Sequence, residues 1–117
     1  AQCAWFARAA VELGPAAADS VEVTAPGRID FWRAALVTGA TEAIARLRRR
    51  GQLPGPVQVD ITEFVGVVVD TSQNTAWLAT FMAVVAAFPE VEPPRLPPCP
   101  TTKLWQWDWP GFPDPCT

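Results

Sequence analysis

The sequence has no histidine and no tyrosine, and its cysteines are limited to Cys3, Cys99 and Cys116. Without histidine the chain has no Ser-His-Asp or Cys-His arrangement, no histidine-ligated zinc site and no access to the commonest general base. The three cysteines do not have the spacing of a metal site. We therefore expect no catalytic residue, no metal ion and no cofactor.

The same three cysteines leave the redox state open, either one disulfide with a free thiol or three reduced thiols. The sequence does not start with the charged and apolar regions of a secretory signal peptide. We favour the reduced form and expect a cytoplasmic location.

Basic residues are also in the minority, with 9 against 12 acidic residues and a net charge of −3. A nucleic-acid-binding protein usually carries a basic surplus, so this balance argues against that class without excluding a local basic patch. Half of the residues are hydrophobic, which suits one domain with a single core.

Two strands are predicted on either side of Gly66. Residues 57–62 alternate between apolar and polar side chains, and a period of two places one face of a strand on a core. The β-branched run 67–69 favours a second strand, with Gly66 in a turn or bulge between the two.

A buried helix is predicted to follow at residues 75–88. The side-chain oxygens of residues 70–72 suit the free N–H groups of a helix start, and Pro89 suits its end. The helix is apolar nearly all round, but its roughly 14 residues fall short of the ~20 that a membrane span needs. We expect it to lie on a sheet; the other interpretation is an interfacial or self-associating helix.

The N-terminal part predicts two strands and an amphipathic helix. Residues 5–13 alternate and end at Gly14-Pro15, and residues 21–24 form a second, short strand. In the segment 32–50 the apolar residues recur every three or four positions, as in a helix with one face on a sheet. Gly51 follows this helix as a C-cap signal.

Four arginines crowd the last turn of this helix: Arg46, Arg48, Arg49 and Arg50. Glu42 precedes Arg46 by four positions, which favours an ion pair on the helix surface. The helix dipole favours positive charge at this end, so a solvated face is the simpler interpretation. The other interpretation is a secondary charged contact with a phosphate or an acidic partner.

Strands and helices intermix along residues 1–88, which predicts an α+β fold, an α/β sandwich. We expect a roughly four-stranded sheet with two helices packed on one face. Residues 89–117 form a separate, irregular region, since they hold nine of the 13 prolines and show neither the helical nor the strand period. The proline pairs in this tail predict an extended polyproline segment.

The tail also carries aromatic residues. In an extended chain Trp105, Trp107 and Trp109 share one face, and disordered segments rarely hold so many aromatic side chains. We therefore expect the tail to dock through these tryptophans and Phe112. Its docking surface is its own domain, a second subunit or another protein.

Four motifs occur in the same order as in a known family. Residues 6–15 read FARAAVELGP, like that family's first strand, and residues 37–55 contain a G-x-x-E-A helix and a G-x-L-x-G turn. Residues 57–61 match the next strand, and residues 69–72 read VDTS where the family has V-D-S-S. On these motifs the segment 6–88 resembles domain IV of elongation factor G. The resemblance implies the ribosomal protein S5 domain 2-like fold.

The chain departs from that family at the places where the family meets RNA. The family carries a histidine shortly before V-D-S-S, in the tip that enters the ribosomal decoding centre, whereas this chain has Val67 and Val68. The family's Gly-rich tip before the first strand is absent, and the chain has no P-loop. The resemblance therefore implies a scaffold that serves another function.

These observations favour a non-enzymatic interaction domain that binds a protein partner or itself, with the Trp-rich tail as its docking segment. The alternative that follows the resemblance is a ribosome- or RNA-associated module, in which the four arginines contact RNA. Nothing in the sequence indicates membrane binding or a small-molecule substrate.

Two further functions have less support. An enzyme would have to use the carboxylate of Asp60, Glu63 or Asp70, or the thiol of Cys99, and each of the carboxylates has a simpler structural role. Cys99 lies among prolines with no histidine to activate it. In the last alternative, the tail is a segment that another enzyme modifies while the body carries it.

Overall fold

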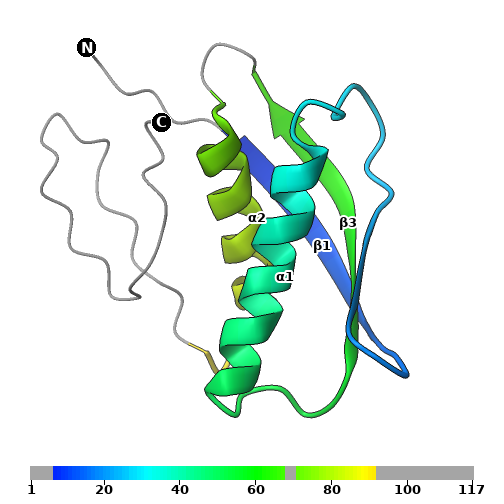
Figure 1. The fold of residues 1–117 in the computed structure, drawn as a ribbon, viewed down its shortest axis with the longest axis vertical. Helices are drawn as coiled ribbons and strands as arrows, with labels where there is room; N and C mark the ends of the chain where they lie inside the picture. The colour runs from blue at the N-terminus through cyan, green and yellow to red at the C-terminus, as the bar shows by residue number, and fades with distance from the viewer. Residues whose placement is uncertain (1–6, 68–70, 92–117) are drawn as a thin grey trace, which may run out of the picture.

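Five elements form in the order strand, strand, helix, strand, helix, in a computed structural model that describes residues 7–67 and 71–91. They are β1 (Ala7–Pro15), β2 (Ser20–Val23), α1 (Arg33–Arg49), β3 (Val57–Gly66) and α2 (Gln73–Ala86). The two helices lie side by side on one face of the sheet (Figure 1). The predicted α+β class, with two helices on one face of a sheet, is thereby confirmed.

The sheet has the strand order β1-β3-β2, so β3 lies in the middle. It is mixed, because β1 pairs with β3 in the antiparallel direction and β2 pairs with β3 in the parallel direction. The apolar side chains Val57, Val59 and Ile61 of β3 are buried, as their alternation predicts. Within the described residues, β1 and β2 are the two edges of the sheet.

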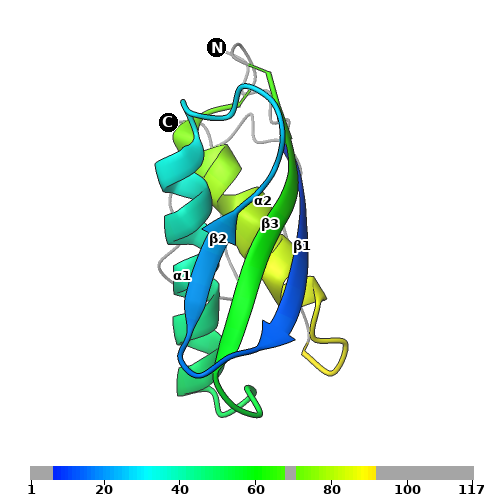
Figure 2. The same ribbon diagram turned by 90° about the vertical axis from the view of Figure 1, so that its right-hand side faces the viewer.

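The connection from β2 through α1 to β3 is left-handed. In Figure 2 both strands run upward, α1 lies behind the sheet and β3 lies to the right of β2. Such connections between parallel strands are right-handed in about 98% of cases. Because few connections of this kind are left-handed, the hand of this one is a more distinctive feature of the topology than the strand order.

The described residues form three strands, not the four that the sequence predicts. Residues 57–66 are one continuous strand, and Gly66 is its last residue instead of a break between two strands. Pairing continues this far because Gly66 lies opposite Ala7 of β1. A Cβ on Gly66 would approach the rings of Phe64 and Trp32 to 2.9 and 3.1 Å, so glycine here makes room for aromatic side chains. Residues 68 and 69 of the predicted second strand lie outside the described residues.

The irregularity expected at Gly66 lies further upstream. The register between β1 and β3 shifts between Ala10 and Val11, which face Glu63 and Ile61, so Thr62 is the extra residue of a β-bulge. The extra residue shifts by one position the alternation between side chains that face the core and side chains that face away from it. As a result Ile61 and Phe64, three positions apart, both point into the core.

Helix α1 matches the predicted helix 32–50 to within one residue at each end. The predicted apolar stripe is buried, namely Leu36, Ala40, Ala43, Ile44 and Leu47. Gly51 has a φ of +68° and donates its N–H to the Arg48 carbonyl oxygen at 3.0 Å, while the N–H of Gln52 donates to that of Leu47 at 2.9 Å. These two bonds form a Schellman motif, which confirms Gly51 as the C-cap signal.

Helix α2 begins at Gln73, because the Ser72 hydroxyl caps it by accepting a 3.0 Å hydrogen bond from the N–H of Thr75. It ends at Ala86, so both of its ends lie two residues before those of the predicted helix 75–88. It packs against α1 and the sheet, which confirms the predicted buried helix. Among the described residues, no helix has the length and apolar character that crossing a membrane requires.

Candidate functional site

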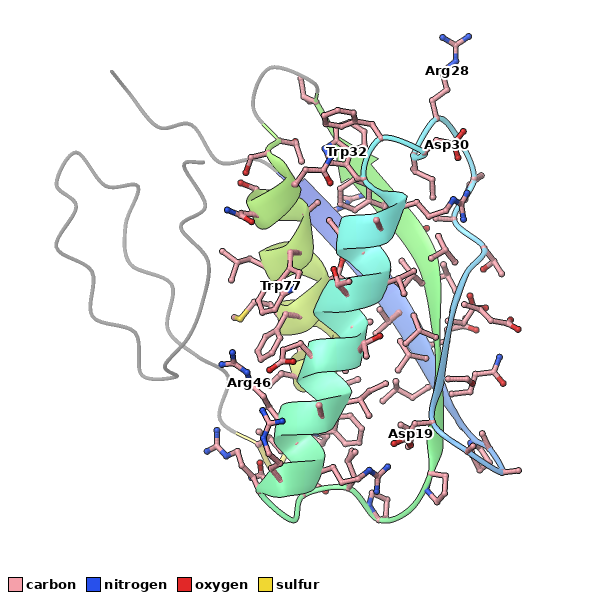
Figure 3. The ribbon with its side chains drawn as sticks, viewed as in Figure 1. Asp19, Arg28, Asp30, Trp32, Arg46 and Trp77 are labelled. Atoms are coloured by element: carbon pink, nitrogen blue, oxygen red, sulfur yellow. The ribbon has the colours of Figure 1, made fainter. Side chains whose placement is uncertain are left out.

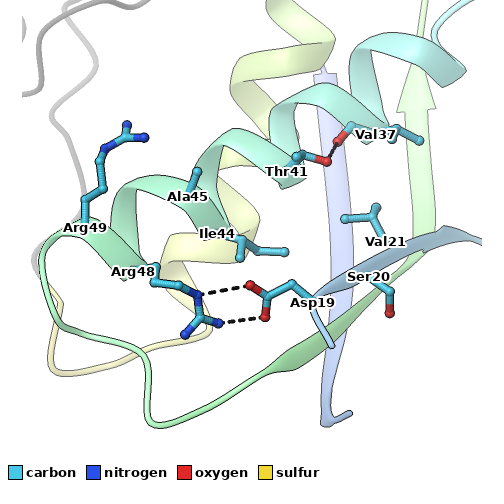
Figure 4. Close-up of a pocket in the computed structure, with 9 residues that line it drawn as sticks. All are labelled: Asp19, Ser20, Val21, Val37, Thr41, Ile44, Ala45, Arg48 and Arg49. Carbon is cyan, nitrogen blue, oxygen red and sulfur yellow. Dashed lines mark hydrogen bonds and ion pairs between the residues drawn. The ribbon is translucent and has the colours of Figure 1, made fainter. Parts of the chain in front are cut away.

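A pocket of about 540 Å³ lies between α1 and the edge strand β2, and we call it the β2–α1 pocket. Its lining residues are Asp19, Ser20, Val21, Val37, Thr41, Ile44, Ala45, Arg48 and Arg49 (Figure 4). Binding pockets in proteins commonly have volumes of about 300–1,000 Å³, with mostly apolar walls and a few polar groups. The β2–α1 pocket has this character, since apolar side chains line its middle and charged ones its end.

The local sequence explains why the pocket forms. On α1, the lining positions from Val37 to Arg48 recur every three or four residues, which makes a second stripe beside the buried one. On β2, Val21 faces α1 while Ser20 and Glu22 are exposed. Because β2 has only four residues and presents valine side chains on its half-buried face, α1 and β2 do not fill the space between them.

One end of the pocket is closed by an ion pair between Arg48 and Asp19. The guanidinium donates to both carboxylate oxygens, at 2.6 and 3.0 Å, and also to the Gly55 carbonyl oxygen at 3.1 Å. Asp19 further accepts a 3.0 Å hydrogen bond from the backbone N–H of Val57. This N–H and the guanidinium lower the pKa of the Asp19 carboxyl below its ordinary value of 3.8.

Sequence reasoning missed Asp19. The sequence offered one sign of its importance, because Asp19 is the single acidic residue between the alanines of the β1–β2 loop and the start of β2. It remained hidden because its partner Arg48 lies 29 positions away. A contact over that separation depends on how α1 returns across the sheet.

Three of the four arginines predicted as a secondary charged contact, Arg46, Arg48 and Arg49, have acidic partners within the domain. Arg46 donates to Glu42 at 2.8 Å, which confirms the predicted pair, and its guanidinium lies 5.5 Å from the ring centre of Phe81. Arg49 reaches Glu42 at 3.4 Å. Figure 3 shows Arg46 and Asp19, the partner of Arg48, on opposite sides of α1. Arg46 and Arg49 therefore share Glu42, whereas Arg48 binds Asp19 on the other side of α1, so the three arginines do not form one cluster.

Two of the carboxylates considered for an enzyme, Asp60 and Glu63, belong to the open face of the sheet. Asp60 lies in register between Glu12 of β1 and Glu22 of β2, and it accepts a 2.7 Å hydrogen bond from the Thr24 hydroxyl. Glu63 is exposed on the same strand. In the part of the chain that the structure describes, no group of three acidic or cysteine side chains could hold a metal ion.

Several predicted site residues lie outside the described residues, so their contacts stay predictions. They are Cys3, Asp70, Cys99, Trp105, Trp107, Trp109, Phe112 and Cys116. Val67, at one of the positions where the resembled family has its histidine-bearing tip, is 44% exposed at the end of β3.

No protein-family model, curated protein or solved structure matches this chain. No substrate or partner can therefore be inferred from a related protein. The β2–α1 pocket and the ion pair that closes it are the features from which function is inferred, since a fold by itself does not imply one.

Proposed function

We propose that this protein is a non-enzymatic interaction domain that binds a protein partner or itself, with the Trp-rich tail as its docking segment. The observation that carries the proposal is the position of the β2–α1 pocket beside the edge of the sheet. An edge strand presents backbone N–H and C=O groups that an extended segment can pair with. A neighbouring apolar pocket can take side chains of that segment, as in recognition by β-strand addition.

The proposal includes the scaffold suggested by the sequence, an elongation factor G domain IV-like module of the ribosomal protein S5 domain 2-like fold. Its support is that the motifs fall on regular elements in the expected order. Residues 7–15 of FARAAVELGP form β1, G-x-x-E-A lies inside α1, and the last two residues of VDTS directly precede α2. Two helices on one face of the sheet also agree with that scaffold.

A second candidate function is ribosome or RNA association, and one observation favours it. The Arg49 side chain is 66% exposed, and its 3.4 Å contact with Glu42 is long for an ion pair. However, Arg46 and Arg48 have shorter bonds to acidic partners, which would have to break before either side chain could bind a phosphate. We therefore rank RNA below a protein partner.

Light scattering on the full chain tests the proposal. The wild type is compared with a variant in which Trp105, Trp107 and Trp109 are replaced by alanine, and with a second variant in which they are replaced by phenylalanine. We expect alanine to abolish dimerisation, or binding of the partner protein, while phenylalanine retains most of it because aromatic area persists. Circular dichroism checks that the domain stays folded.

Two outcomes would contradict the proposal. If the alanine variant unfolds, the tryptophans belong to the core and are not a docking segment. If it keeps the mass and the partner of the wild type, the tail is not the segment through which the protein binds a partner or itself. Binding to ribosomes that falls steeply with salt concentration, and survives the alanine substitutions, would instead support the RNA alternative.

A further inference from the structure

We propose that the β2–α1 pocket is the docking site for residues 101–109 of this chain, which pair with the free edge of β2 as an additional strand. The inference rests on the proposed function, in which the tail docks, and it names the surface that receives the tail.

The edge of β2 is open within the described residues. β2 is the last strand of the order β1-β3-β2, and among residues 7–67 and 71–91 its one pairing partner is β3. After Val23 the chain turns inward, since the N–H groups of Thr24 and Ala25 both donate to the Ile61 carbonyl oxygen at 3.0 Å. The outer side of β2 therefore offers a short row of backbone groups that a second extended segment can pair with.

The pocket lies where alternate side chains of such a segment would point. In a strand added beside β2, every second side chain projects to the face of the sheet that α1 covers. On that face Val21, Val37 and Ile44 line an apolar volume of about 540 Å³. Aromatic side chains bury about 150–250 Å² each, so a tryptophan placed here would gain a large area of apolar contact.

Residues 101–109 have the features that this position demands. They are a proline-free stretch of the tail, bounded by Pro100 and Pro110, and proline would remove N–H groups that the added strand must donate. Tryptophan occupies positions 105, 107 and 109, and polar residues occupy positions 106 and 108. This alternation would direct the aromatic face to the pocket and the polar face to water.

The connecting segment is long enough. The described chain ends at Val91, after α2, and both helices end at the same end of the molecule (Figure 1). Arg48 of the pocket also lies in the last turn of α1. Residues 92–100, in an extended polyproline conformation of about 3.1 Å per residue, would span roughly 28 Å. This length exceeds the ~10–12 Å width of the one helix that separates α2 from the pocket.

Backbone amide NMR spectra of the full chain test the inference. The wild type is compared with the variant carrying alanine at Trp105, Trp107 and Trp109. We expect the largest shift differences at residues 19–23 and along the pocket side of α1. Differences confined to α2 or to the loop before α1, or no differences within residues 7–91, would overturn the inference.

A blocking variant provides a second readout. Thr41→Phe places a bulky side chain in the pocket, and Thr38→Phe is its matched control on the same helix. Both threonines are exposed and donate to the carbonyl oxygen four residues back, at 2.7 and 2.8 Å, but only Thr41 lines the pocket. We expect Thr41→Phe to reduce the tail-dependent shifts at residues 19–23 by at least half, and Thr38→Phe to leave them unchanged.

These measurements separate the pocket from the proposed function. If the tail changes the solution mass or partner binding and Thr41→Phe has no effect on either, the interaction function stands and the pocket is overturned. If the tail changes neither mass, nor partner binding, nor the spectrum, both proposals fail. Tail-dependent shifts at the pocket that grow with protein concentration would assign the bound segment to a second copy, and concentration-independent shifts to the same molecule.

Discussion

Arg48 holds Asp19 through two hydrogen bonds, of 2.6 and 3.0 Å, across 29 positions of sequence. The same carboxylate accepts the backbone N–H of Val57, the first residue of β3. One acidic side chain therefore links the β1–β2 loop, the last turn of α1 and the start of β3. The same ion pair forms one end of the β2–α1 pocket, so it affects both the stability and the shape of the site.

Replacing Asp19 with asparagine should reduce the loss of stability in acid. Because the pKa of Asp19 is lowered from 3.8, the unfolded chain takes up this proton at a higher pH than the folded chain. The stabilisation is complete above about pH 5 and is lost as the pH falls through the unfolded-state and then the folded-state pKa. In urea unfolding, the wild type should lose more free energy between about pH 7 and about pH 3 than the variant does.

Some acid sensitivity should remain in that variant. The pKa of Glu42 is also lowered from its ordinary 4.5, chiefly by the hydrogen bond from Arg46, so it contributes over an adjoining pH range in the same direction. Asp30→Asn is the control, because Asp30 is exposed and its contact with Arg33 measures 3.4 Å. Identical pH dependences for wild type and Asp19→Asn would contradict this account of Asp19.

Gly39→Ala should destabilise the domain although alanine is the better helix former. Gly39 lies inside α1, where alanine alone would add roughly 0.5–1 kcal/mol of stability. A Cβ at this position would overlap the backbone carbonyl oxygen of Trp77 on α2, so the helices would have to separate. We expect a net loss of about 1–3 kcal/mol in the free energy of unfolding.

Gly14→Ala is the control for that substitution, since no atom of the described residues, apart from its two chain neighbours, lies within 4 Å of the Cβ position. Thermal and urea unfolding of both variants measure the difference. A stabilised Gly39→Ala variant would show that α1 and α2 do not approach as closely as described.

Thr71→Val should weaken the closure of the loop between β3 and α2. The Thr71 hydroxyl accepts the N–H of Val67 at 2.8 Å, and its carbonyl oxygen accepts the indole N–H of Trp32 at 3.0 Å. Valine has a similar shape but leaves the partly buried Val67 N–H without this acceptor, at a cost of about 1–3 kcal/mol. Thr71→Ser keeps the hydroxyl and should lose less of the free energy of unfolding. Urea unfolding of the two variants measures the difference.

Ser72→Ala should shorten or weaken the start of α2. Its hydroxyl accepts the N–H of Thr75 at 3.0 Å, and removal of such a cap typically costs about 1 kcal/mol. Ser72→Asp retains an acceptor and adds a favourable charge at the helix N-terminus, so it should be at least as stable as wild type near neutral pH. Amide exchange at Thr75 that is faster in Ser72→Ala, but not in Ser72→Asp, would support Ser72 as the cap of α2.

The sequence by itself determined the features that depend on near neighbours. The spacing of Leu36 to Leu47 predicts the buried face of α1, Gly51 marks its end, and Glu42 pairs with Arg46 one turn away. The cap at Ser72 is equally local. Each of these depends on a period of 3.6 residues or on hydrogen bonds within one turn, so the residues that decide them are adjacent in the sequence.

Only the tertiary structure decided the features that join distant segments. β3 lies between β1 and β2 and continues to Gly66 because β1 pairs with it along its whole length. The Asp19–Arg48 ion pair and the β2–α1 pocket form because α1 returns across the sheet beside a short edge strand. Strand pairing and pocket shape depend on which segments meet in space, and alternation along one strand shows which of its faces is buried but not which strand lies beside it.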